Sequence, residues 1–305
     1  MSATLASHPD RATPLLKERV RRLFRHLPKA LAGDEEEIHQ MRVAGRRLRV
    51  ALPLLSQKPD GRRVERALSI LKELTRAAGR SRDLDVGVEI LEERLRSLDA
   101  SRERAIFRRR LRAARTRSRT TMTEALLDLE IARLRRHLRA IVARRAEGTF
   151  TVLVRMRELR DGSGAFVGDL GLEVARYDAE GLHRLRRRTR RLRYTAEVSD
   201  AIRGQETEAP AIMKKLQDLL GRGHDAHVLA GWLGRQAWAA ERAGDAALAE
   251  EARALEAFFH EKTQEHHRAF VDADPAGLAR RALDALGPAA DAAPQAGGGG
   301  LECAS

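Results

Sequence analysis

Two segments of the chain share the same spacing of one histidine and several arginines. Residues 38–49 read IHQMRVAGRRLR, and residues 182–193 read LHRLRRRTRRLR. The planar guanidinium group of arginine can donate two parallel hydrogen bonds to phosphate oxygens. A histidine beside an extended anion is favoured in its cationic form, so binding should tighten as pH falls. These residues predict a ligand rich in phosphate, bound by two similar parts of the chain.

On a helical wheel each segment divides into two faces. One face carries the histidine and most arginines, and the opposite face is apolar, with Ile38, Met41 and Leu48 in the first copy. No acid interrupts either cationic segment, although like charges one turn apart destabilise a helix. Their retention in both copies favours an anionic ligand over a merely solvated surface. The candidate binding residues are His39, Arg42, Arg46, Arg47, Arg49, His183, Arg186, Arg187, Arg190, Arg191, Arg193 and Tyr194. The Tyr194 hydroxyl either donates to the ligand or packs.

A second pattern follows each arginine segment. Residues 79–86 read GRSRDLDV and residues 221–228 read GRGHDAHV. Glycine is typical of the position that ends a helix, and aspartate of the first turn of the next one. We therefore expect Gly79 and Gly221 to end helices, and Asp83 and Asp225 to cap the following helices or to orient an arginine.

Helical periodicity dominates the chain, and strand patterns are nearly absent. The predicted helices span residues 11–31, 35–57, 61–78, 83–98, 101–129, 131–145, 172–203, 208–220, 224–243, 245–270 and 275–286. The glycine-rich segment 161–171 is the predicted linker between an N-terminal half, 11–160, and a C-terminal half, 172–286. Residues 287–305 are a predicted disordered tail. The expected fold is all-α, with two pseudo-repeated four-helix bundles facing a central basic cavity or pore.

The composition agrees with a folded protein that binds a polyanion. Of 305 residues 43% are hydrophobic, and the formal net charge is +14. Such a charge points to nucleic acid, an anionic membrane surface or an inorganic phosphate polymer. No apolar run is long enough to span a membrane, and the single cysteine, Cys303, permits no disulfide framework. We therefore expect a cytoplasmic protein without membrane insertion.

Further arginines lie outside the two repeated segments. Residues 102–119 are almost free of acids, but their arginines spread around the predicted helix instead of forming one stripe. We assign Arg82 and three of these arginines to the phosphate-binding surface as well: Arg108, Arg112 and Arg115.

At these residues the chain resembles the CHAD family, the conserved-histidine α-helical domains. The family's His-x-x-Arg-x-x-x-Arg-x-x-Arg helix is similar to His39, Arg42, Arg46, Arg49 and to His183, Arg186, Arg190, Arg193. Its Gly-x-x-Arg-Asp-x-Asp turn is matched by Gly79, Arg82, Asp83 and Asp85, and its Leu-Gly-x-x-x-Asp counterpart by Leu220, Gly221 and Asp225.

The resemblance covers roughly residues 11–286. It implies two facing helical bundles whose basic cavity binds inorganic polyphosphate at polyphosphate granules. Family members often sit beside a triphosphate-tunnel domain, whose Glu-x-Glu-x-Lys strand motif is missing from this chain. We therefore expect a binding protein without enzymatic activity, cofactor or metal.

Parts of the sequence also fit two other functions. His224 and Asp225 form an HD dipeptide with His227 one turn later, as in metal-dependent phosphohydrolases. The equivalent residues of the first copy are Arg82, Asp83 and Asp85, which favours a structural role for the shared aspartate. Nucleic-acid binding is the stronger alternative, because arginines also contact nucleic-acid phosphates. Only 4% of the residues are aromatic, however, which leaves few platforms for stacking bases.

Overall fold

The computed structural model describes residues 10–161, 164–172 and 177–286, and these residues are almost entirely helical. The helices are α1 (Ala12–Leu31), α2 (Glu35–Leu55), α3 (Arg62–Arg96), α4 (Arg102–Leu127), α5 (Ile131–Ala143), α6 (Thr149–Asp161), α7 (Gly164–Leu172), α8 (Ala179–Arg203), α9 (Ala209–Arg242), α10 (Ala246–Asp272) and α11 (Pro275–Ala285). The predicted all-α class is confirmed. The predicted tail, 287–305, lies outside the described residues.

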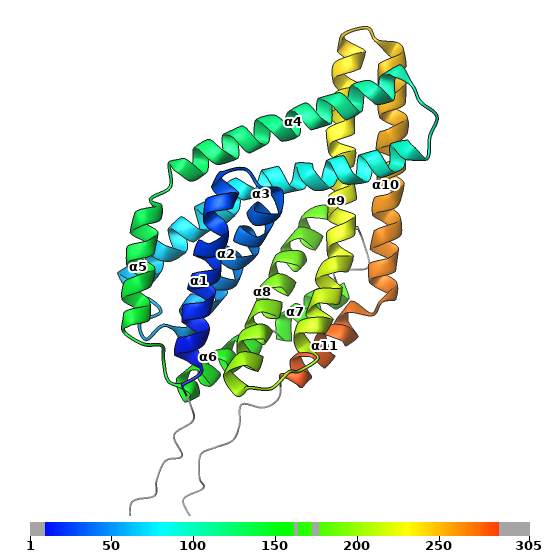
Figure 1. Ribbon diagram of the computed structural model, residues 1–305. Helices are drawn as coiled ribbons and strands as arrows, with labels where there is room; N and C mark the ends of the chain where they lie inside the picture. Colours follow the sequence, from blue (N-terminus) through cyan, green and yellow to red (C-terminus); the bar gives the residue numbers. More distant parts are fainter. Residues whose placement is uncertain (1–9, 162–163, 173–176, 287–305) are drawn as a thin grey trace, which may run out of the picture.

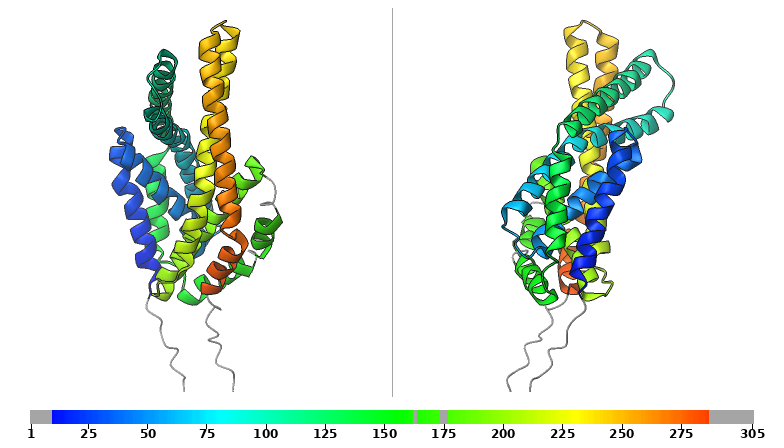
Figure 2. Two further views of the ribbon diagram at one scale, coloured as in Figure 1. Left: turned by 90° about the vertical axis from the view of Figure 1, so that its right-hand side faces the viewer. Right: turned by 60° about the vertical axis from the view of Figure 1, so that its left-hand side comes forward.

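Two long helices give the molecule its shape. α3 continues past the N-terminal end of α2 and is accompanied there by α4, while α9 and α10 form a pair that projects beyond the other helices (Figures 1 and 2). α2 contacts α8, so the two arginine-rich helices lie side by side at the middle of the molecule.

The two arginine helices begin in the same way. Asp34 caps α2 by accepting a hydrogen bond from the Glu37 N–H, and Asp178 caps α8 by accepting from the Glu180 and Gly181 N–H groups. A carboxylate at this position satisfies unpaired N–H groups and complements the positive end of the helix. The cap therefore fixes where each helix starts.

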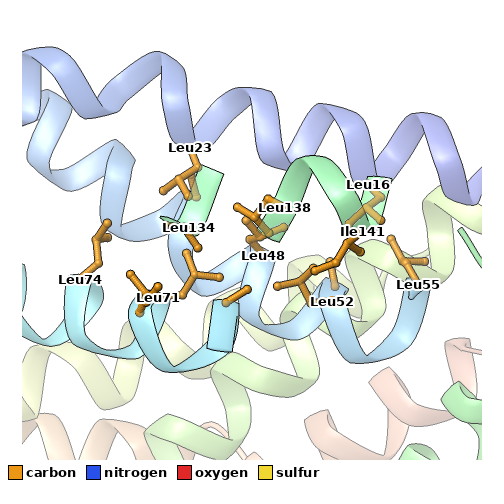
Figure 3. Close-up of a cluster of buried hydrophobic side chains, with 14 of the residues drawn as sticks. Leu16, Leu23, Leu48, Leu52, Leu55, Leu71, Leu74, Leu134, Leu138 and Ile141 are labelled. Carbon is orange, nitrogen blue, oxygen red and sulfur yellow. The ribbon is translucent and has the colours of Figure 1, made fainter. Parts of the chain in front are cut away.

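Three clusters of buried side chains form the core. The first joins α1, α2, α5 and the N-terminal part of α3 (Figure 3). The second joins the C-terminal part of α3 to the start of α4, the C-terminal part of α9 and α10. The third joins α7, α8, α11 and the N-terminal part of α9. The apolar stripe predicted for α2 is fully buried, as Ile38, Met41 and Leu48 show.

Three boundaries differ from the predictions. Helix α3 runs through Gly79 and α9 runs through Gly221, so neither glycine ends a helix. Both helices are held together by apolar side chains on each side of the glycine, which outweighs its poor helix propensity. Most of the predicted linker, 161–171, belongs to α7 (Gly164–Leu172), because Phe166 and Leu170 are buried in the third cluster.

Candidate anion-binding groove

A groove of about 1110 Å³ lies between α8 on one side and α2, α3 and α6 on the other. Its lining is predominantly cationic, with only two carboxylates, Glu65 and Glu158. The lining cations are Arg46, Arg49, Lys72, Arg155, Arg184, Arg187, Arg188, Arg190 and Arg191. The groove therefore brings residues of both sequence copies to one surface.

The cations of the groove differ in what they already contact. Arg155 donates to the carbonyls of Leu54 and Ser56 and pairs with Glu147 at 3.2 Å. Arg188 pairs with Asp169. In contrast, five lining arginines have no carboxylate within salt-bridge distance in the described part of the chain: Arg46, Arg49, Arg187, Arg190 and Arg191. These five side chains provide charge that the protein itself leaves uncompensated.

The guanidinium groups are most crowded where α2 and α8 meet. Burial, together with the neighbouring Arg46 and Arg186, lowers the pKa of Arg190 to about 9. Burial likewise lowers the pKa of Arg42 to about 10, with Arg46 the next cause. Within the described residues, the buried Nε atoms of Arg186 and Arg190 have no hydrogen-bond acceptor. An anion placed here would relieve both the repulsion and the missing hydrogen bonds.

Residues at and near the two repeated glycines hold arginines in position. Arg42 is buried and donates from Nη1 to the carbonyls of Ala78, at 2.7 Å, and Gly79, at 3.0 Å. In the second copy, Arg186 lies 3.8 Å from the carboxylate of Asp225. Burial raises the pKa of Asp225 to about 6, against the opposing influence of Arg186. Arg42 is therefore buried against α3 and does not line the groove.

The histidines lie next to the arginines, and their pKa values are lowered. Burial is the largest cause for both His39 and His183, followed by Arg82 for His39 and Arg186 for His183. His183 and His224 have ring centroids 5.3 Å apart and line a separate pocket of about 30 Å³. Burial lowers the pKa of His224 to about 3. In the described residues, no group of three His, Cys, Asp or Glu side chains is placed to hold a metal ion.

Several candidate residues are engaged in contacts within the protein. Arg47 makes a bidentate ion pair with Glu197, at 2.7 and 2.8 Å, and Arg193 contacts the same carboxylate at 3.4 Å. Tyr194 lies beneath both guanidiniums, 5.6 and 5.7 Å from its ring centre, and is buried apart from its edge on the groove.

The arginines of α4 lie outside the groove. Arg112 pairs with Glu92 at 2.6 Å, and Arg115 lies 3.7 Å from Glu35. Arg108 is on the same helix and is not part of the groove lining.

Four groove cations were absent from the sequence-based set: Lys72, Arg155, Arg184 and Arg188. Arg184 and Arg188 could have been found, because they share one helical face with Arg187 and Arg191. Lys72 and Arg155 come from helices outside the repeated pattern, so only the tertiary structure reveals them.

Among the described residues, no helix combines the length and apolar composition needed to cross a lipid bilayer.

The chain matches one family model and two related bacterial sequences. The family model described as "CHAD domain" matches residues 14–234. Two proteins of Mycobacterium tuberculosis, MT2285 of strain CDC 1551 and Rv2226 of strain H37Rv, are each 31% identical over 227 residues. The match covers 70% of this chain and 43% of each relative, so the chain spans less than half the length of these curated proteins.

Two solved structures share the fold. The structure described as PptA from Streptomyces chartreusis superposes with a TM-score of 0.63 at 17% identity, covering 88% of this chain and 99% of the other. The crystal structure of the CHAD domain from the plant Ricinus communis gives a TM-score of 0.60 at 22% identity, with 92% of each chain covered.

Proposed function

The chain belongs to the CHAD domain family, and on that premise we propose that it binds inorganic polyphosphate, without turning it over, in the groove between α2 and α8. The observation that carries this proposal is the set of five groove arginines without a carboxylate partner in the described residues. A polymer with one negative charge per repeating unit neutralises such a row without needing any other recognition. The protein would act by holding the polymer, at polyphosphate granules in the cytoplasm.

Nucleic acid is the alternative ligand, and the groove lining argues against it. Among the described residues, Tyr194 is the only aromatic residue of the lining, and Arg47 and Arg193 already contact its ring. A single-stranded nucleic acid would therefore find no free surface on which to stack a base.

A competition experiment tests the ligand. Labelled long-chain polyphosphate is bound to the protein at physiological salt and challenged with duplex DNA, RNA, ATP and pyrophosphate. We expect only unlabelled polyphosphate to displace the label efficiently at equal phosphate concentration. Displacement by DNA or RNA at that concentration would refute the proposal. Release of orthophosphate that depends on a divalent metal and is lost in Asp225→Asn would replace it with the phosphohydrolase function.

The position of the site is tested by a charge-matched pair of variants. Arg46→Ala with Arg190→Ala removes two groove guanidiniums that lack a carboxylate partner in the described residues. Arg109→Ala with Arg117→Ala removes two exposed guanidiniums of α4 and changes the net charge equally. We expect the groove variant to lose roughly 100-fold in affinity, measured by titration calorimetry, and the α4 variant less than about threefold. Equal losses would mean that binding depends on diffuse charge and not on the groove.

A further inference from the structure

A second cavity, of about 340 Å³, lies where the loop after α2 meets the N-terminus of α3 and the end of α5. Its polar lining includes Ser56, Lys58, Gly61, Arg62, Arg63 and Arg144. We propose that this cavity is a separate binding site for a single phosphoryl group or a pyrophosphate. This proposal does not depend on the ligand of the main groove.

The Ser56 hydroxyl is the first observation that points to a ligand. Ser56 is 1% exposed, and its Oγ has no hydrogen-bond partner within the described part of the chain. The backbone around it is fixed, because its N–H donates to the Leu52 carbonyl and its carbonyl accepts from Arg155 at 2.8 Å. A buried hydroxyl without a partner is unfavourable, and a phosphate oxygen in the cavity would satisfy it.

The N-terminus of α3 supplies backbone donors to the same cavity. No side chain caps this helix at Gly61, whose carbonyl accepts from the Val64 and Glu65 N–H groups. The N–H groups of Arg62 and Arg63 have no acceptor among the described residues. Free N–H groups at the positive end of a helix of 35 residues are a favourable place for an anion.

The charge of the lining has the sign that a phosphate requires. Lys58, Arg62, Arg63 and Arg144 are exposed, and none has a carboxylate partner in the described residues. The nearest acid in sequence, Asp60, is exposed on the loop and is not part of the lining. The C-terminal end of α5 also borders the cavity, but the Arg144 and Arg145 N–H groups already occupy the carbonyls of Ile141 and Val142.

The end of α2 and the loop after it separate this cavity from the main groove. Pro53, Leu54 and Pro59 line the groove, while Ser56, Lys58 and Gly61 line the second cavity. The volume of the cavity suits a compact anion and not a length of polymer. Free phosphate, pyrophosphate and the terminal phosphate of a nucleotide share the chemistry that this site recognises.

Backbone amide NMR provides a readout at the site itself. Inorganic phosphate, pyrophosphate and ATP are titrated separately into the Arg46→Ala/Arg190→Ala protein, in which the main groove is weakened. We expect saturable shifts of the Gly61, Arg62 and Arg63 amide signals with at least one probe. The probe that binds most tightly identifies the source of the phosphoryl group. The absence of saturable shifts at these three amides with every probe would overturn the proposal.

Variants test which groups form the site. Lys58→Ala with Arg63→Ala should weaken the probe roughly tenfold or more, whereas the charge-matched Arg109→Ala/Arg117→Ala pair should leave it unchanged. Ser56→Ala removes only the buried hydroxyl and should weaken the probe severalfold while the protein remains folded. Equal weakening by the two charge-matched pairs, or full affinity in Ser56→Ala, would show that the cavity is not a formed site.

Discussion

At the scale of single residues, the arginines of the two repeated segments divide according to whether an acid opposes them. Glu197 of α8 receives Arg47 from α2, Arg193 from its own helix and Arg19 from α1. Arg46 and Arg190 have no such partner among the described residues, although they lie on the same two helices. One carboxylate therefore links α1, α2 and α8, while Arg46 and Arg190 keep an uncompensated charge within the described residues.

Removing the Glu197 charge should destabilise the protein. Glu197→Gln leaves three largely buried guanidiniums around a neutral amide, so we expect the free energy of unfolding to fall by about 3 kcal/mol. Chemical denaturation measures this change. Asp218→Asn is the control, because it breaks an exposed pair with Lys214 and should cost less than about 0.5 kcal/mol. A loss in Glu197→Gln no larger than in the control would contradict the assigned role.

The two motif histidines should couple polyphosphate binding to pH. His39 lies near Arg82, Arg42, Arg46 and Glu36, and His183 lies near Arg186, Arg187, Arg190 and Asp83. Burial and these arginines lower both pKa values, so both rings are neutral in the free protein at neutral pH. A bound polyanion favours the imidazolium and raises both pKa values, so protons are taken up on binding.

Affinity should therefore rise as pH falls from the pKa of the complex towards the lower pKa of the free protein. Calorimetry in buffers of different ionisation enthalpy would count the protons taken up. His39→Gln with His183→Gln should remove most of the uptake, and an unchanged uptake in this variant would exclude these residues as its source. Stability should behave oppositely: the folded state binds fewer protons than the unfolded one, so stability falls as pH drops below about 6.5.

At the scale of helices, the two glycines of the repeated turns lie inside continuous helices. In α3, a Cβ built on Gly79 meets no atom within 4 Å, and the backbone there is helical. Gly244, which follows α9, has φ +72° and likewise has free space around it. The two positions thus differ in backbone conformation and not in packing.

Alanine should therefore have opposite effects at these two glycines. We expect Gly79→Ala to raise the free energy of unfolding by about 0.5–1 kcal/mol, because glycine is a poor helix former. We expect Gly244→Ala to lower it by about 1 kcal/mol, because alanine is strained at positive φ. Thermal or chemical unfolding compares them. Destabilisation by Gly79→Ala would instead favour a helix end at that position.

The helices were predictable where periodicity decides and not where tertiary packing decides. The apolar stripe of α2 and the cationic face of α8 follow from spacing alone, and Arg46, Arg49, Arg187, Arg190 and Arg191 do line the groove. Glycine chemistry suggested breaks at Gly79 and Gly221, but the buried side chains on both sides keep α3 and α9 continuous. The ion pairs of Arg47 and Arg112 depend on Glu197 and Glu92, which lie far away in sequence. A local sequence pattern does not predict which carboxylate will pair with each of these arginines.

At the scale of the whole molecule, the continuous helices connect parts that the sequence suggested were separate halves. The C-terminal part of α3 belongs to the first half but is buried against α9 and α10, through Val88, Leu91 and Leu95. In return, Val198 and Ile202 of α8 belong to the core of α1, α2 and α5. Neither half can leave the other without exposing part of a shared core.

Unfolding should accordingly be one cooperative transition. Leu48→Ala creates a cavity in the first core cluster, and Leu91→Ala creates a cavity in the second. Both side chains are at most 1% exposed. Each should lower the free energy of unfolding by about 3 kcal/mol. Because α3 runs through both clusters, the lost stability is shared by the whole molecule and the transition stays single. Calorimetry tests this: two separated transitions in either variant would mean that the clusters unfold independently and that the halves are autonomous domains.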